Sequence, residues 1–121
     1  MHNKIKTIIT LVTMTLVLCS CSKQQKAESV INDFLEANLQ ASDYTVSFSD
    51  IDSTRYVSDS IVNIMRAEAL KNKMFKKGIK YAGKSKQYIY TRVTICIDND
   101  TTSHTFYLTP DMNQVVSFKA N

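Results

Sequence analysis

The sequence predicts an α+β fold, in which two helices pack on one face of a curved antiparallel sheet of about four to five strands. Three observations lead to this prediction. Two segments before residue 76 have apolar residues at the three-and-four spacing of amphipathic helices. A run rich in β-branched and aromatic residues follows at 87–98. Two shorter runs after it, each introduced by turn residues, complete the order of elements.

The first helix is predicted over residues 27–41, where Val30, Ile31, Phe34 and Leu35 recur on one side. Because this helix has a single apolar side, we expect it to cover the apolar face of the sheet.

The second helix is predicted to begin at Ser58 or Asp59, either of which can cap it, and to run on to Phe75. The apolar residues expected on its buried side are Ile61, Val62, Met65, Ala69 and Leu70. Lys73, Lys76 and Lys77 suit the negative end of the helix dipole, and Gly78 suits the left-handed residue after the last turn.

The strands are predicted from alternation: a strand or an extended lead-in within 43–51, a short strand at 78–83, the long run at 87–98, and returns at 103–109 and 114–119. Parity predicts an even loop after the long run, because an odd loop would scatter the apolar residues over both faces. The core face is then Ile89, Val93, Ile95, Ile97, Phe106, Leu108 and Phe118.

The first twenty residues have the order of an export signal: Lys4 and Lys6, an uncharged stretch at 8–18, and then "LCSC". The apolar stretch is shorter than the ~20 residues that span a bilayer. "LCSC" resembles a bacterial lipobox, which implies cleavage before Cys21, a diacylglycerol on its thiol and an acylated amino group. The resemblance predicts a membrane-anchored lipoprotein of the cell envelope, and Ser22, which is not aspartate, favours the outer membrane.

The domain organisation follows from that cleavage: a signal peptide at 1–20, a lipidated tether at 21–26 and one domain at 27–121. Removal of Lys4 and Lys6 leaves 13 basic and 11 acidic residues, so the net charge falls from +4 to +2. This balance gives no reason to expect nucleic acid as a partner. Cys96 is left without a partner cysteine, so no disulfide framework is predicted.

The order helix, strand, helix and consecutive antiparallel strands is similar to small cystatin-like and nuclear-transport-factor-like domains. The first family's inhibitory hairpin is matched by Gln114 and Val116, but Phe118 stands where glycine is needed. The second family's catalytic pockets hold a buried acid or histidine near a tyrosine, and no core-face strand position here carries an acid. The resemblance therefore implies a fold and carries over no site residue.

No catalytic, cofactor-binding or metal-binding residue is predicted, and the chain is interpreted as not an enzyme. His104 is expected beside the core face in a structural role, and Cys96 is expected to be a small buried residue rather than a nucleophile. One histidine and one thiol give no ligand spacing for zinc.

The second sheet face is the predicted interaction face, since tyrosine and arginine are common in binding hot spots. Its residues are Tyr88, Tyr90, Arg92 and Tyr107. The sequence thus favours a non-enzymatic binding or assembly module, with a homodimer or a cell-envelope protein as partner. Two alternatives stay open: loops cover this face, or the protein carries a small ligand in a pocket between helices and sheet.

Overall fold

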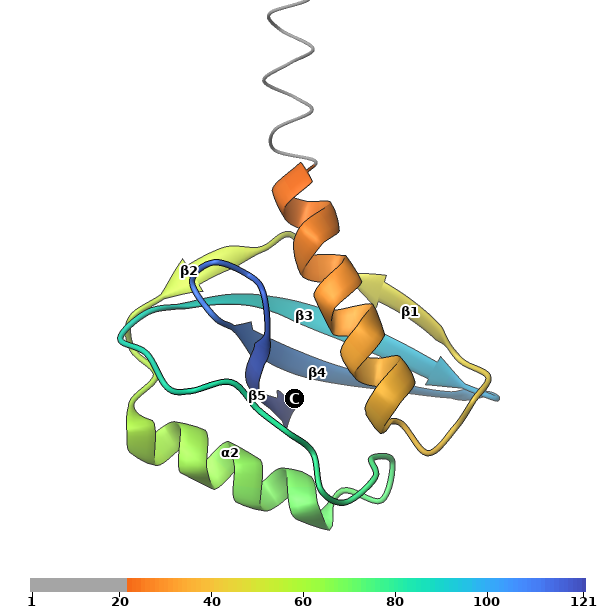
Figure 1. Ribbon diagram of the computed structural model, residues 1–121. Helices are drawn as coiled ribbons and strands as arrows, with labels where there is room; N and C mark the ends of the chain where they lie inside the picture. Colours follow the sequence, from red (N-terminus) through yellow and green to blue (C-terminus); the bar gives the residue numbers. More distant parts are fainter. Residues whose placement is uncertain (1–21) are drawn as a thin grey trace, which may run out of the picture.

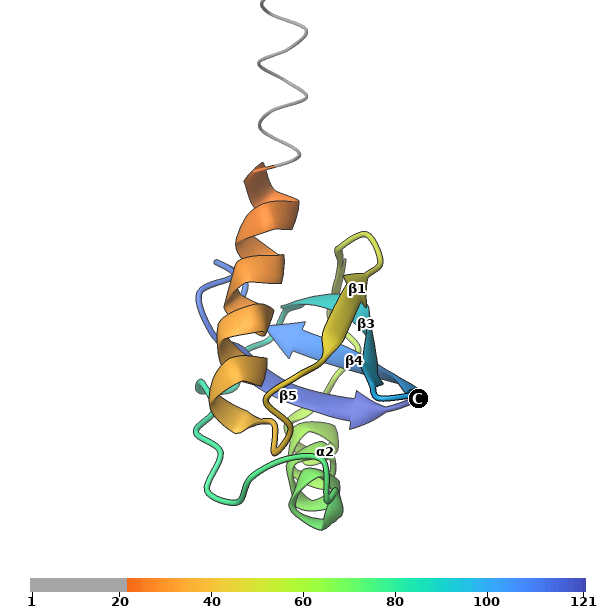
Figure 2. The same ribbon diagram turned by 90° about the vertical axis from the view of Figure 1, so that its right-hand side faces the viewer.

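The computed structural model describes residues 22–121. The predicted signal peptide at 1–20 and the predicted lipidation site Cys21 lie outside the described residues. Residues 22–38 are helical and lie across one face of a sheet, and the helix α2 (Asp59–Lys71) lies beside the last strand of that sheet (Figures 1 and 2). No helix of this described part is both long and apolar enough to cross a membrane.

The sheet has five antiparallel strands in the order β1-β3-β4-β5, with β2 pairing β3 beside β1. The strands are β1 (Thr45–Phe48), β2 (Asp52–Thr54), β3 (Tyr88–Ile97), β4 (Asp100–Leu108) and β5 (Val115–Ala120). Two helices on a five-stranded antiparallel sheet confirm the predicted α+β fold. The sheet is open, so β5 forms one of its edges.

The turn between β3 and β4 confirms the parity argument. Ile97 pairs with Asp100, which leaves a two-residue loop, and Val93 lies opposite His104. Asp98 has a φ of 55°, the left-handed conformation that two-residue hairpin turns require. The apolar residues of both strands therefore share one face, as predicted.

We call the larger hydrophobic cluster the main core. It joins the first helix to that face of the sheet, and Ile31, Leu35 and Phe106 in it are completely buried. The rings of Phe106 and Phe118 stack with their centroids 5.1 Å apart. Its buried members are Ala27, Ile31, Phe34, Leu35, Leu39, Ala69, Phe75, Val93, Ile95, Phe106, Leu108, Val115 and Phe118. The predicted core residues Ile89 and Ile97 are half-buried against it.

A smaller cluster, which we call the second cluster, lies on the opposite face. Its buried members are Val62, Met65, Ala82, Tyr88, Tyr107 and Val116. The buried residues of α2 therefore belong to both clusters: Ala69 packs in the main core, whereas Val62 and Met65 pack in the second cluster. Of the two helices in the described residues, only the first lies along the predicted core face (Figure 2).

The first helix is longer than predicted, because residues 22–26 belong to it rather than to a separate tether. The Gln24 side chain donates to Ser49 O at 3.0 Å and accepts from the Ile51 N–H at 2.9 Å. Lys26 Nζ donates to Asp111 O at 2.9 Å. These bonds hold this first part of the helix on the domain, and Ala27 is completely buried.

The helix α2 begins as predicted, with the Ser58 hydroxyl accepting from the Ile61 N–H. Its predicted end is wrong: it ends at Lys71. Asn72 is extended and its side chain accepts from the Met74 N–H, which competes with further helix. Phe75 then pairs with Leu39 in an isolated bridge. Gly78 does have positive φ, at 80°, but lies well beyond the helix.

The prediction of a strand at 78–83 is also wrong. The structure describes this segment as a loop, because it forms too few backbone hydrogen bonds with a neighbouring strand. Ala82 N–H donates to Val115 O at 2.9 Å. The Arg66 guanidinium donates to Ala82 O at 2.7 Å and to Val116 O at 3.1 Å, and lies over the Tyr81 ring. An arginine of α2, rather than a ladder, thus holds this loop against β5.

Candidate binding site

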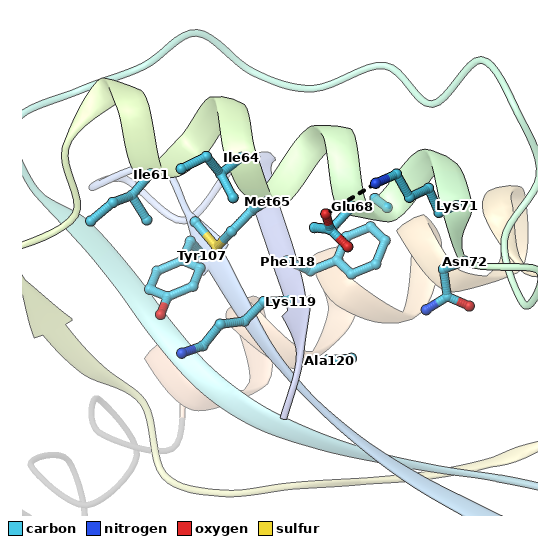
Figure 3. Close-up of a pocket in the computed structure, with 11 residues that line it drawn as sticks. Ile61, Ile64, Met65, Glu68, Lys71, Asn72, Tyr107, Phe118, Lys119 and Ala120 are labelled. Carbon is cyan, nitrogen blue, oxygen red and sulfur yellow. Dashed lines mark hydrogen bonds and ion pairs between the residues drawn. The ribbon is translucent and has the colours of Figure 1, made fainter.

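The helix α2 and the last residues of β5 enclose an open groove of about 600 Å³, which we call the α2–β5 groove (Figure 3). Most of its lining is apolar, and the few charged side chains lie at its rim. It is lined by Ile61, Ile64, Met65, Glu68, Ala69, Lys71, Asn72, Tyr107, Phe118, Lys119 and Ala120.

Large apolar side chains on the groove wall are open to solvent. Ile61 is 43% exposed and Ile64 is 61% exposed. The predicted burial of Ile61 and of Leu70, which is 66% exposed, is therefore wrong. The 13 residues of α2 can present only a narrow stripe to the sheet, and Val62 and Met65 occupy it. The excess apolar residues of α2 are left facing solvent.

Tyr107 and Met65 form the floor of the groove, where Met65 points toward the tyrosine ring (Figure 3). Tyr107 is only 8% exposed. Burial, followed by the neighbouring Tyr90, raises the pKa of Tyr107 above its ordinary value. Its hydroxyl therefore stays neutral at physiological pH and can both donate and accept a hydrogen bond.

The rim of the groove carries charge of both signs. Glu68 and Lys71 pair with each other at 3.5 Å, and both side chains are largely exposed, so the pair contributes little to stability. Lys119 lies on the opposite rim, beside Tyr107 (Figure 3). No acidic residue within 22–121 forms an ion pair with Lys119. The groove thus presents a cation beside an apolar wall.

The predicted interaction face is divided by this arrangement. Tyr88 is completely buried, and its hydroxyl accepts from the Ser85 N–H at 2.8 Å, so it cannot contact a partner. Tyr107 lies in the groove floor. Tyr90 is half-buried with its ring 6.1 Å from that of Tyr107, and Arg92 is exposed farther along β3. The helix α2 and the segment around Ala82 provide the cover for this face.

The groups considered for chemistry lie apart from the groove. His104 is buried among Phe75, Phe106 and Phe118, as its core-side position predicted, and burial lowers its pKa. Its Nδ1 has no hydrogen-bond partner among residues 22–121. Cys96 is only half-buried, unlike the prediction, with its Sγ 2.9 Å from Thr101 Oγ1. No group of three or more His, Cys, Asp or Glu side chains in residues 22–121 could hold a metal ion.

The sequence predicted Tyr107 as part of an interaction face, but it did not predict that Ile61, Ile64 and Lys119 would lie beside it. One signal was present: α2 carries more apolar residues than a single buried stripe needs. The approach of α2 to the end of β5 depends on the loop between α2 and β3, for which the sequence predicted a strand.

Comparison of the chain with protein-family models, with curated proteins and with solved structures found no match. The cystatin-like resemblance therefore stays a prediction about family, while the α+β architecture rests on the structure itself.

Proposed function

We propose that this protein is a membrane-anchored lipoprotein of the bacterial cell envelope that acts as a non-enzymatic binding module. In this proposal Cys21 carries the lipid and the α2–β5 groove captures a partner. The observation that carries the binding role is the exposure of Ile61 and Ile64, which line the groove. Apolar patches rimmed by polar groups are typical of interaction sites.

The position of the groove fits an anchored protein. The first turn of the first helix, drawn in orange, lies at one end of the domain, and α2 lies at the opposite end (Figure 1). A lipid on Cys21 would hold the first end at the bilayer, and several acyl chains together give stable anchoring. The groove would then face away from that membrane, toward proteins of the envelope.

Anchoring is tested by mass spectrometry of the protein isolated from its native membrane and by detergent-phase partitioning. We expect a mature chain that begins with a triacylated Cys21, and a Cys21→Ser variant that moves to the aqueous phase. An intact leader, or detergent partitioning that the substitution leaves unchanged, would contradict lipidation.

Capture is tested by placing a photo-cross-linking residue at position 64 of the lipidated protein in its native envelope. The matched control has the same residue at Asn32, an exposed position on the first helix. We expect a discrete protein adduct at position 64 and none at position 32. Equal adduct patterns at both positions would rule out the groove as the capture site.

A second candidate function is the carriage of a small apolar ligand, because about 600 Å³ lies within the usual ~300–1,000 Å³ of small-molecule sites. A ligand that binds only the folded state at a hundred times its Kd stabilises by about 2.7 kcal/mol. Thermal unfolding in the presence of a panel of apolar metabolites tests this function. A shift that Ile64→Glu removes would favour it, and no shift across the panel would count against it.

A further inference from the structure

The free edge of β5 lies in the α2–β5 groove. The Asn121 N–H donates to Ser103 O at 2.9 Å, so residues 121, 119 and 117 direct their backbone groups toward β4. The alternation of an antiparallel ladder then directs the N–H and C=O of Phe118 and Ala120 away from β4. Phe118 and Ala120 both line the groove.

Upstream on the same edge, the outward groups already have partners. Val115 O accepts from the Ala82 N–H, and Val116 O accepts from Arg66. At Phe118 and Ala120 no such hydrogen bond is found within residues 22–121. The edge is thus covered where α2 and its loop contact β5, and open where the groove begins. Backbone groups on an open edge are a template for pairing with an extended chain.

The open stretch is short. The helix α2 crosses the line of β5 at a steep angle, and in Figure 2 it is seen nearly end-on below that strand. A chain added to the edge can therefore pair only with the last residues of β5 before it meets α2. Its side chains at that point would contact Ile61 and Ile64, which are exposed.

The charge of Lys119 distinguishes between two partners for this edge, a second copy of the chain and a different protein. If two copies paired antiparallel through this edge with Phe118 opposite Ala120, each Lys119 would face the other, and like charges directly opposite are unfavourable. Lysine on an edge strand is a common guard against self-pairing. An acidic residue opposite Lys119 would instead form a favourable cross-strand pair, and no residue of 22–121 supplies one.

We propose that the α2–β5 groove binds an extended segment of a different protein by short strand addition to Phe118–Ala120. In that segment an acidic residue lies opposite Lys119 and an apolar residue contacts Ile61 and Ile64. This inference rests on the proposed function, because it describes how the same groove would recognise its partner. Backbone pairing supplies affinity in this mode, and the flanking side chains supply specificity.

The probe is a random-peptide phage library, selected against the full lipidated chain in nanodiscs and, in parallel, against its Ile64→Glu variant. We expect enriched peptides with apolar residues at alternate positions around one acidic residue, and no such enrichment by Ile64→Glu. Lys119→Glu is expected to weaken binding of the enriched peptides about fivefold, which is the upper range for a cross-strand charge pair. No enrichment over the variant, or enrichment of basic peptides, would overturn the inference.

Backbone pairing is tested with N-methylated versions of the best enriched peptide. Methylation of alternate amides on the edge facing β5 is expected to abolish binding, while methylation of the intervening amides leaves it intact. The amides of Phe118 and Ala120 are expected to become protected from hydrogen exchange on binding. Equal effects of both methylation patterns, or enriched peptides with the three-and-four spacing of helices, would overturn strand addition. The proposed function would still stand if the cross-link at position 64 were found.

Discussion

The two faces of the sheet are closed to different degrees. On one face the main core is sealed by the first helix, and aromatic rings such as Phe106 and Phe118 stack within it. On the other face the second cluster is small, and α2 covers it while leaving Ile61 and Ile64 in solvent. The contrast indicates that the first face carries most of the stability, whereas the second face is less completely closed.

The largest expected effect is in the main core. Phe106→Ala should lower the free energy of unfolding by about 3–5 kcal/mol, because it leaves a large cavity among completely buried residues. Met65→Ala in the second cluster should cost about 2 kcal/mol, at the lower end for a buried methionine, because its side chain borders an open groove. Urea denaturation of both variants measures this difference. Equal losses of unfolding free energy would contradict the greater contribution of the main core to stability.

The next effect concerns the loop that covers the edge of β5. Arg66→Ala removes two hydrogen bonds from a charged group and a contact with the Tyr81 ring, so we expect a loss of about 2–3 kcal/mol. Faster hydrogen exchange at the Ala82 amide should accompany the loss. Arg92→Ala, at an exposed position, is the control and should change stability by less than about 0.5 kcal/mol. A stable Arg66→Ala variant with a protected Ala82 amide would contradict this account.

A smaller effect on stability depends on pH and arises from His104, which packs against the main core. Burial lowers the pKa of His104 in the folded state below the ordinary value of 6.5, so between these two pH values the unfolded chain binds more protons. The contribution of His104 to stability is therefore complete above pH 6.5 and is lost as the pH falls toward the folded-state pKa. The slope is at most about 1.4 kcal/mol per pH unit for one proton.

This pH dependence is tested by measuring the free energy of unfolding at a series of pH values from about 7.5 down to 5. His104→Leu should abolish most of the slope in this interval, since carboxylates titrate mainly at lower pH. A variant with the slope of the parent protein would show that another group is responsible.

The fold could be predicted where local signals agree with long-range packing. The β3–β4 register followed from parity, because only an even loop keeps Val93 and Phe106 on one face. The end of α2 could not be predicted, because a tertiary bridge between Leu39 and Phe75 and a side-chain bond from Asn72 stop the helix.

The candidate site was predicted only in part, because it too depends on tertiary contacts. Tyr107 was found from strand alternation, but its place in a groove depends on where α2 crosses β5, and that crossing depends on Arg66 and a loop without regular structure. Sequence periodicity assigned Ile61 to a buried stripe, since it cannot show which of several apolar residues the sheet will cover.

The role of the α2–β5 groove is best tested with Ile64→Glu in the lipidated protein, with stability and partner capture measured on the same preparation. Asn63→Glu is the matched control, because it adds the same charge at an exposed position of α2 outside the groove. Both variants should keep the unfolding free energy within about 1 kcal/mol of the parent protein. Ile64→Glu alone should lose the partner that the parent retains from its native membrane. Capture of the same partner by both variants, at parental levels, would contradict the assignment of binding to the α2–β5 groove.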